Sequence, residues 1–245
     1  MTTKQLDEAP PQAIAELTRT LGDNEHYRGD ADFGSVVSYP ERAKLWGDGG
    51  YRGNCDGRLF LNLLLHYRPR SVADPMLGSG TTRDVVAGLN QRTQTHIDYW
   101  GGDLHSGFDL SAQTLPGKYD LVWLHPPYWN IIEYHNGTAD LSAVSDYAEF
   151  LDRLTSCLKR CFDALHPGGR LAVLIADVRR RGKYYPLGKH VMDLDGQIGA
   201  LHSVIIKTQH NCRSDSRTYY RLEDPRIRHE YCLVFKRSID ESTSR

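Results

Sequence analysis

The chain has 245 residues, 40% of them hydrophobic, and a formal net charge of −1. This is enough apolar sequence for one substantial α/β domain but short for two. The near-neutral charge excludes a global basic field as the means of binding nucleic acid, so local basic clusters or a partner would have to supply that binding. No apolar run approaches the length of a membrane span and the first residues do not resemble a signal peptide, so we expect a cytoplasmic protein.

The first part of the chain is polar and interrupted by a pair of prolines. Within it, residues 13–21 could form one short amphipathic helix. We expect residues 1–38 to be a partly flexible leader, residues 39–237 to be the folded domain and residues 238–245 to be a flexible tail. The leader could cover a site or serve as a dimer arm, and the sequence does not choose between these.

A glycine turn follows the first buried strand. Residues 58–67 are apolar at helical spacing, then a short apolar run at 71–74 enters the turn Gly-Ser-Gly at 78–80, and residues 81–91 continue as a helix. Strand, glycine turn and helix N-terminus together form a cofactor pocket at the carboxyl edge of a parallel sheet. Glycine lets the backbone pass close to a bound group, and Asp74 places a carboxylate where a cationic or hydroxyl-bearing ligand would lie. The stretch lacks the phosphate-cradle pattern and matches G-x-G-x-x-G poorly.

A second motif lies just past another strand. The sequence His-Pro-Pro-Tyr-Trp at 125–129 follows the apolar run 119–124. Consecutive prolines have no N–H to donate and hold the chain extended, which fixes the direction of their carbonyls. Tyr128 and Trp129 offer flat faces beside them. A rigid acceptor next to an aromatic face suits a planar base with an exocyclic amine. The alternative is a proline turn capped by core aromatic residues.

Together these motifs resemble those of the S-adenosyl-L-methionine (SAM)-dependent amino-methyltransferases, which modify adenine N6 or cytosine N4 in DNA. Residues 74–82 (DPMLGSGTT) resemble the cofactor motif D-P-F-x-G-S-G-T-T, and residues 125–128 (HPPY) resemble the catalytic motif [DNS]-P-P-[YFW] with His in the first place. Residues 46–54 look like the segment before the cofactor motif, and residues 229–236 (HEYCLVFK) look like the closing H-E-x-x-x-V-F-K strand. The resemblance covers most of the domain. It implies an α/β fold of the Rossmann-like methyltransferase type, with a mostly parallel central sheet, helices on both faces and a late antiparallel hairpin.

The resemblance implies SAM as the cofactor. Asn54 would then lie near its methionine end, although a helix-capping asparagine is the alternative. Asp103 follows a second strand at 96–102 and could accept both ribose hydroxyls, or it could be a solvated loop residue. Asp109 could bind the adenine amine. The expected cofactor-binding residues are Asn54, Asp74, Pro75, Met76, Leu77, Gly78, Ser79, Gly80, Thr81, Thr82, Asp103 and Asp109.

An exocyclic amine is a poor nucleophile because its lone pair is delocalised into the ring. Two hydrogen-bond acceptors would pull the nitrogen toward tetrahedral geometry and free the lone pair. We expect the Pro126 carbonyl and residue 125 to accept these bonds, while Tyr128 stacks on the flipped base. The expected catalytic residues are His125, Pro126, Pro127 and Tyr128.

His125 departs from the family pattern. A neutral imidazole has one acceptor nitrogen and a protonated imidazole has none. We therefore expect a rate that falls as the pH drops through the histidine pKa, and a flat profile from about pH 5.5 to 8 would count against the role. The alternative is that His125 points away and activity is weak or lost.

Basic residues with aromatic residues between them occur at 179–185 and again within 207–229. This pattern suits phosphate contacts combined with base stacking, although a solvated loop is the alternative. Two late strands, 201–207 and 231–236, would form a hairpin whose connection is long for a turn. The expected nucleic-acid-binding residues are Trp129, Arg179, Arg180, Arg181, Lys183, Arg213 and Arg217.

The five cysteines have no C-x-x-C spacing. Cys157 and Cys161 lie four residues apart within a predicted helix at 145–164. A zinc pair is conceivable there, but buried reduced thiols are favoured and we expect no metal.

The sequence predicts methyl transfer from SAM to the exocyclic amine of a flipped base in DNA, with adenine N6 slightly ahead of cytosine N4. The alternatives are an RNA base N-methyltransferase and a non-catalytic SAM-binding partner subunit. DNA is the expected partner. The motif order leaves little room for a target-recognition domain, so a homodimer or a separate specificity subunit is also considered.

Overall fold

The computed structural model describes residues 33–41, 43, 46–93, 96–134, 137–210 and 224–239. Within them, a seven-stranded sheet has the order β1-β8-β9-β5-β4-β2-β3, and β6 and β7 form a separate small hairpin. The strands are β1 Val36–Ser38, β2 Ser71–Asp74, β3 Asp98–Gly101, β4 Tyr119–Leu124, β5 Leu165–Ile175, β6 Val178–Arg180, β7 Lys183–Tyr185, β8 Ala200–Thr208 and β9 His229–Lys236. The α-helices are α2 Gly57–Tyr67, α3 Thr81–Thr93, α4 Tyr147–Asp163 and α5 Leu187–Met192, and short 3-10 helices span Leu104–Ser106, Trp129–Ile131 and Leu141–Ala143.

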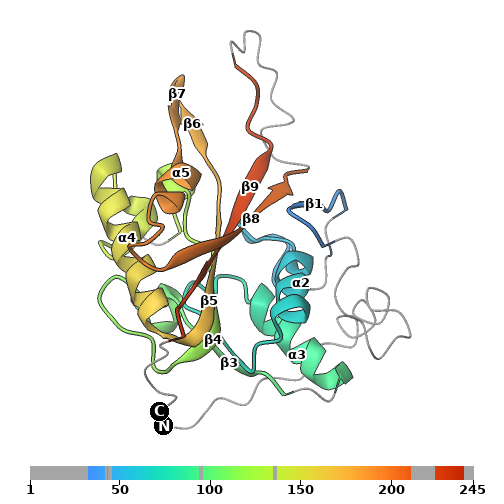
Figure 1. Ribbon diagram of the computed structural model, residues 1–245. Coiled ribbons are helices and arrows are strands. Elements are labelled where there is room, and N and C mark those ends of the chain that lie inside the picture. The colour runs from blue at the N-terminus through green and yellow to red at the C-terminus, as the bar shows by residue number, and fades with distance from the viewer. Residues whose placement is uncertain are drawn as a thin grey trace.

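The central sheet is mostly parallel. Neighbouring pairs β2–β3, β2–β4, β4–β5 and β1–β8 run parallel, and β9 runs antiparallel to both β5 and β8. Helices α2 and α3 cover one face of the sheet, while α4 and α5 cover the other (Figure 1). The predicted α/β class, with a Rossmann-like sheet and a late antiparallel hairpin, is confirmed.

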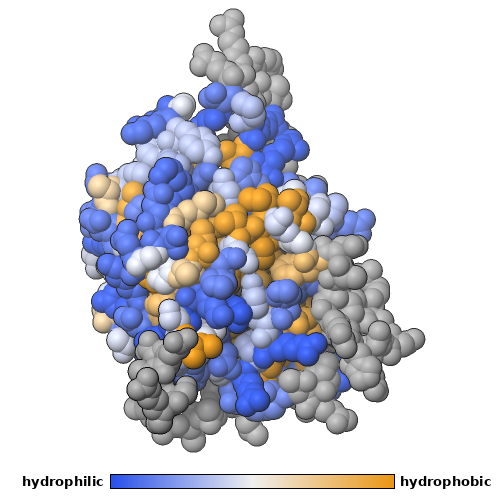
Figure 2. All heavy atoms as spheres, in the orientation of Figure 1, coloured by the Kyte–Doolittle hydropathy of each residue, from blue (hydrophilic) through white to orange (hydrophobic). Residues whose placement is uncertain are grey.

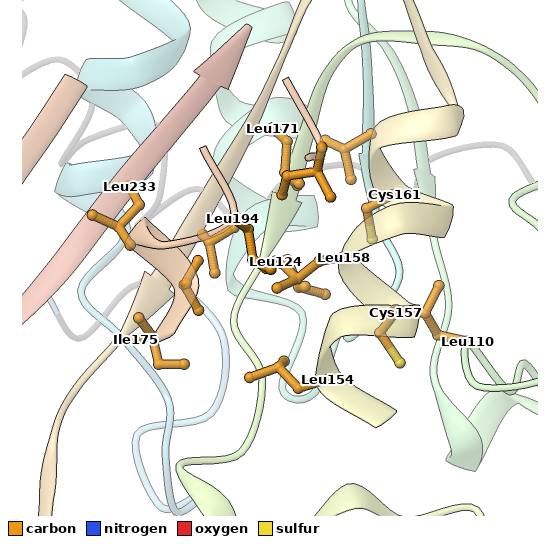
Figure 3. Close-up of a cluster of buried hydrophobic side chains, with 14 of the residues drawn as sticks. Leu110, Leu124, Leu154, Cys157, Leu158, Cys161, Leu171, Ile175, Leu194 and Leu233 are labelled. Atoms are coloured by element: carbon orange, nitrogen blue, oxygen red, sulfur yellow. The ribbon is translucent and has the colours of Figure 1, made fainter. Parts of the chain in front are cut away.

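Each face of the sheet has its own apolar core. Side chains of α2 and α3 pack with Val72, Leu121 and Trp123 on one face. On the other face, Phe150, Leu154, Cys157, Leu158 and Cys161 form the buried stripe of α4. Figure 3 shows the part of this stripe from Leu154 to Cys161 against leucines of the sheet. Burial of a leucine or phenylalanine contributes about 1.5–3 kcal/mol, so these two cores fix the sheet between its helices.

Aspartates at their N-terminal ends define where helices α2 and α4 begin. Asp56 caps α2 by accepting a hydrogen bond from the Arg58 amide, and Asp146 caps α4 by accepting one from the Glu149 amide. An aspartate at this position satisfies an amide that the first helical turn leaves without a partner. Helix α2 ends where Arg68 adopts a left-handed conformation, just before a proline.

Several boundaries differ from the sequence prediction. Strand β3 spans Asp98–Gly101 rather than residues 96–102, because only these four residues pair with β2. Strand β1 lies inside the stretch expected to be a leader and pairs in parallel with β8. The predicted helix at 13–21 lies outside the described residues. No helix in the described ranges is both long and apolar enough to cross a membrane.

Four of the five cysteines fall within the described residues. Cys55, Cys157, Cys161 and Cys232 are buried and form no disulfide, as the preference for buried thiols predicted. Burial raises the pKa of Cys157 to about 12, so this thiol stays protonated at neutral pH. The fifth, Cys212, lies outside the described ranges.

Candidate active site

The carboxyl ends of β2, β3 and β4 meet at one edge of the sheet because these strands are parallel neighbours. A cleft with about 950 Å³ of space, open to solvent, lies at this edge. The carboxyl edge of a parallel sheet is where open α/β folds bind their ligands. All of the predicted cofactor-binding residues except Gly80 line it, and so do His125 and Pro127 of the predicted catalytic motif.

The glycine turn is held by backbone hydrogen bonds to the segment after β3. The Leu77 amide donates to the Gly102 carbonyl at 3.2 Å, and the Gly102 amide donates to the Asp74 carbonyl at 3.0 Å. Gly78 has a φ of 52°, and a Cβ there would lie 3.2 Å from the Tyr51 ring. A side chain at this position would therefore be strained and crowded at the wall of the cleft.

Asp74 ends β2 and is buried, with 2% of its surface exposed. Its carboxylate accepts hydrogen bonds from the Met76 amide at 3.1 Å and the Thr82 hydroxyl at 2.5 Å. Burial nevertheless raises the pKa of Asp74 to about 7, and none of the charged groups that affect this pKa is a cation. Within the described residues Asp74 forms no ion pair, and a buried carboxylate on the wall of a cleft without such a partner favours a cationic ligand.

Asp103 joins two parts of the cleft wall. One carboxylate oxygen accepts from the Gly78 amide at 3.1 Å, and the other accepts from the Ser106 amide at 2.9 Å. The residue thus caps the 3-10 helix Leu104–Ser106 and orients the glycine turn, which a simple solvated loop residue would not do. Each oxygen has a second lone pair that can accept from a ligand. Asp109, further along, accepts from the amide and hydroxyl of Ser111.

The segment before α2 is fixed to the start of α3. The Asn54 side chain donates to the Asp48 carbonyl at 2.9 Å and accepts from the Thr81 hydroxyl at 2.5 Å. The Gly47 amide donates to the Asp84 carboxylate at 2.9 Å. The alternative that Asn54 caps a helix is wrong, because Asp56 is the cap of α2.

A chain of four polar side chains lies behind the catalytic motif. His125 Nε2 is 3.0 Å from the Tyr128 hydroxyl, which donates to Glu230 Oε1 at 2.8 Å. Lys207 Nζ donates to Glu230 Oε2 at 2.5 Å, and both of these side chains are buried. Burial lowers the pKa of His125 to about 4, against the opposing effect of Glu230, so the imidazole is neutral at physiological pH.

Trp129 occupies a different place from the one expected. It is 6% exposed, its indole N–H donates to the Val144 carbonyl at 2.9 Å, and its ring packs against Tyr147 and Tyr185. The guanidinium of Arg180 lies 5.3 Å from the centre of the same ring. In this structure Trp129 is a core side chain, which corrects the expectation of an exposed face for stacking a nucleic-acid base.

The predicted basic residues divide into two groups. Arg179 faces Asp224 at 3.4 Å and Arg180 donates to Asn130, so both have partners within the protein. Arg181 and Lys183 are exposed at the tip of the β6–β7 hairpin. This hairpin extends from the upper end of the molecule (Figure 1), where hydrophilic side chains gather (Figure 2). Two further residues of the prediction, Arg213 and Arg217, lie outside the described residues.

A family model described as DNA methylase, of the N6 and N4 type, matches residues 119–243, which is slightly more than half of the chain. The chain belongs to this DNA methylase family. The match includes the catalytic motif and the closing strand β9, so the predicted membership is confirmed.

Three further proteins are similar to this chain. A reducing polyketide synthase of a Penicillium species, grgA, is 31% identical over 142 residues, which are 55% of this chain but only 6% of that protein. TTHA0409 of Thermus thermophilus, a candidate DNA modification methylase solved with SAM, is 27% identical and has a TM-score of 0.37; the match covers 53% of this chain and 51% of that one. The N-methyltransferase NodS of Bradyrhizobium japonicum WM9, solved with S-adenosyl-L-homocysteine, is 12% identical over 92% of this chain and 98% of its own, with a TM-score of 0.41.

Sequence reasoning missed two residues that contact the candidate catalytic motif directly or through one other side chain. Glu230 belongs to the quoted H-E-x-x-x-V-F-K stretch, but the pattern alone assigns it no role, and Lys207 is one of many basic residues in its region. The sequence feature that could have identified Glu230 is a carboxylate inside a strand whose other interior residues are mostly apolar. Its partner could not be found from sequence, because the pairing of Lys207 with Glu230 depends on the register of β8 and β9.

Proposed function

We propose that this family member transfers a methyl group from SAM to the exocyclic amine of a base in DNA, adenine N6 in the first instance and cytosine N4 otherwise. The observation that carries the proposal is that His125, the first residue of the catalytic motif, lines the same cleft as Asp74 and the glycine turn. A cofactor and a target amine could therefore meet in one place. Membership of the DNA methylase family supports the reaction class and DNA as the substrate.

The residues at the cleft suit SAM in charge, hydrogen-bonding capacity and apolar surface. Asp74 offers a buried carboxylate without a counterion to a ligand that carries positive charge. Asp103 keeps acceptor capacity for hydroxyl groups. Met76, Leu77 and Phe108 supply apolar wall for the remainder. When bound, SAM supplies an electrophilic methyl group, and the protein's task is to hold the target amine in line with it.

The catalytic motif is suited to hold an amine. Neutral His125 has one acceptor nitrogen for an N–H of the base. The carbonyl of Pro126 is the proposed acceptor for the second N–H, because the following proline fixes its direction. Two accepted bonds draw the amine nitrogen out of conjugation and direct its lone pair toward the methyl group. Tyr128 would provide a ring for the flipped base to stack on.

Binding of DNA would use the tip of the β6–β7 hairpin. Arg181 and Lys183 are exposed there beside Tyr184, which is 40% exposed. Cations that track phosphates with an aromatic face between them are a common arrangement for nucleic acids. With a formal net charge of −1, the protein would rely on such local contacts or on a second subunit for the rest of its affinity.

The test is transfer of labelled methyl from SAM to genomic DNA and, separately, to total RNA, followed by nucleoside analysis. Label in N6-methyladenine of DNA is the expected result, and label in N4-methylcytosine would reassign the base. Asp74→Asn and a Pro126→Ala/Tyr128→Ala double variant serve as controls for the cofactor and the catalytic side. Label found only in RNA, or no label although SAM binds, would contradict the proposal.

A further inference from the structure

The chain formed by His125, Tyr128, Glu230 and Lys207 connects three separate parts of the fold. His125 and Tyr128 lie on the loop after β4, Lys207 lies near the end of β8 and Glu230 is the second residue of β9. Lys207 and Glu230 are each less than a tenth exposed, so the pair is buried within the protein. Burying an ion pair is costly unless its geometry and its other hydrogen bonds are good, which raises the question of what the pair supports.

The proton of Tyr128 can be assigned from its partners. Burial alone would raise the pKa of Glu230, but Lys207 and its other partners hold that pKa below the usual value, so the carboxylate is ionised and can only accept. Burial raises the pKa of Tyr128 well above its usual value, so its hydroxyl stays protonated. The single hydroxyl proton is therefore donated to Glu230 Oε1.

This assignment determines the state of the histidine. Because the Tyr128 hydroxyl has already donated its proton, it can only accept in its 3.0 Å contact with His125 Nε2. Nε2 must then carry a hydrogen. In a neutral imidazole the other nitrogen, Nδ1, is bare, and no hydrogen bond to it is present within the described residues.

We propose that Lys207, Glu230 and Tyr128 are positioning residues that fix His125 as the tautomer with hydrogen on Nε2, and so present Nδ1 to the target amine as an acceptor. This inference rests on the proposed function, in which His125 accepts a hydrogen bond from the substrate. The opposite tautomer would point an N–H at the N–H of the amine, and this contact would be repulsive. Locking the orientation of a catalytic histidine through a second residue is a general way to prevent that error.

The chain offers an informative substitution. Tyr128→Phe keeps an aromatic ring for stacking but removes the hydroxyl that accepts from Nε2. If Tyr128 acted only by stacking, this variant would be fully active. The inference instead predicts that kcat falls about five- to tenfold, while KM for DNA and the affinity for SAM stay close to wild type. Tyr119→Phe is the matched control, because Tyr119 begins β4 at the end opposite to His125.

The decisive readout is the tautomer itself. Full-length protein with ¹⁵N-labelled histidine, free of cofactor and DNA, is studied by long-range ¹H–¹⁵N correlation at about pH 7.5, where an unperturbed histidine is also mostly neutral. The signals of His125 are assigned with His125→Gln. Wild type and Tyr119→Phe should show a protonated Nε2 with a resolved proton and a bare Nδ1. Tyr128→Phe should lose that proton signal to exchange with water and show the two nitrogen shifts moving toward each other.

A wild-type His125 with hydrogen on Nδ1, or an Nε2 proton signal that Tyr128→Phe leaves unchanged, would overturn the inference. The tautomer is measured without substrate, so it is independent of methyl transfer. A locked Nε2–H tautomer in a protein that methylates no nucleic acid would refute the proposed function while leaving the positioning chain intact. Methyl transfer to DNA by a protein whose His125 carries its hydrogen on Nδ1 would support the proposed function and refute the positioning role of Lys207, Glu230 and Tyr128.

Discussion

Two buried carboxylates at this active site have opposite electrostatic surroundings. Asp74, on the cofactor side, accepts from an amide and a hydroxyl, and burial raises its pKa to about 7. Glu230, on the catalytic side, accepts from a hydroxyl and from the Lys207 ammonium. Burial alone would raise the pKa of Glu230, but Lys207 together with its other partners keeps that pKa below the usual value. Both are hydrogen-bonded and less than a tenth exposed, so the counterion makes the difference. Among the described residues, Asp74 has no cation beside it, whereas Glu230 is already paired with Lys207 before any ligand binds.

The largest expected effect comes from removing the internal cation. Lys207→Met leaves Glu230 as an uncompensated buried charge, so we expect the free energy of unfolding to fall by about 3–5 kcal/mol. Denaturant titration measures this loss of unfolding free energy. It is done at about pH 8, which lies above the pKa of Asp74 and of Glu230 in the wild type. The double variant Lys207→Met/Glu230→Gln should recover most of the loss because it removes both charges.

Asp74→Asn is the matched change on the other side. The folded pKa of Asp74 lies above its unfolded value, so its favourable contribution is complete at low pH and is lost as the pH rises through about 7. At about pH 8 the neutral asparagine should therefore cost much less than Lys207→Met does. Equal losses for the two variants would contradict the contrast between the sides.

The pH dependence of catalysis is the next largest effect. The pKa of His125 is about 4, so the imidazole remains neutral, and kcat for DNA should be flat from about pH 5 to 8. Below that range, kcat should fall by about tenfold per pH unit as the acceptor nitrogen is protonated. His125→Asn, which keeps an acceptor that does not titrate, should lack this fall. A midpoint near the ordinary histidine pKa would show that His125 is more exposed in the working enzyme.

This window differs from the one expected from sequence. A histidine in the first motif position suggests a titration in the physiological range, and a flat profile there would count against its role. Burial of the His125 side chain explains the difference, because it lowers the pKa of His125 to about 4, below the physiological range. The residue type alone indicates that His125 can accept a hydrogen bond. Its pKa depends on the surroundings that the loop after β4 and the strands β8 and β9 create, and these surroundings require the folded structure.

The contact between Gly47 and the start of α3 offers another test of the cofactor side. Gly47 has a φ of 68°, and a Cβ there would lie 2.4 Å from the Thr81 hydroxyl and 2.5 Å from that of Ser79. We expect Gly47→Ala to weaken SAM binding by about tenfold, by displacing the start of α3, and to leave the Lys207–Glu230 pair intact. The control is Gly196→Ala, because Gly196 also has a positive φ of 75° but has nothing within 4 Å of the added Cβ. Isothermal titration calorimetry with SAM compares the two variants. Equal affinities of Gly47→Ala and Gly196→Ala for SAM would show that the close approach of Gly47 to α3 is not needed for binding.

The sequence predicted most of the fold because its signals were local. Apolar periodicity located α2 and α4, and the strand-turn-helix order at Asp74 located the edge of the sheet where the cleft lies. Position alone did not reveal that Trp129 is buried, since an aromatic residue after a proline pair can face either way. The short strand β1 and the hairpin β6–β7 were also missed. Their few residues carry no periodicity, and only tertiary pairing defines them.

The smallest expected effect is at the hairpin tip. Arg181→Gln/Lys183→Gln removes two exposed cations and should lower DNA affinity by about fivefold at moderate salt. The slope of log affinity against log salt should become shallower by about 2 units, and SAM affinity should not change. Lys159→Gln on the exposed face of α4 is the control. An unchanged salt slope would place the DNA elsewhere.

The most direct measurement is the affinity for SAM as a function of pH, in wild type and in Asp74→Asn, by calorimetry in buffers of different ionisation enthalpy. Between about pH 5.5 and 7 the ammonium group of SAM stays charged, so the protein's own groups control the change. In the protein without cofactor, the pKa of Asp74 is about 7. The affinity of the wild type for SAM should therefore rise about tenfold per pH unit in this range, and binding should release one proton from Asp74. Asp74→Asn should bind more weakly and without this slope. An affinity that does not vary with pH in wild type, or the same slope in both proteins, would contradict a cation-binding role for Asp74.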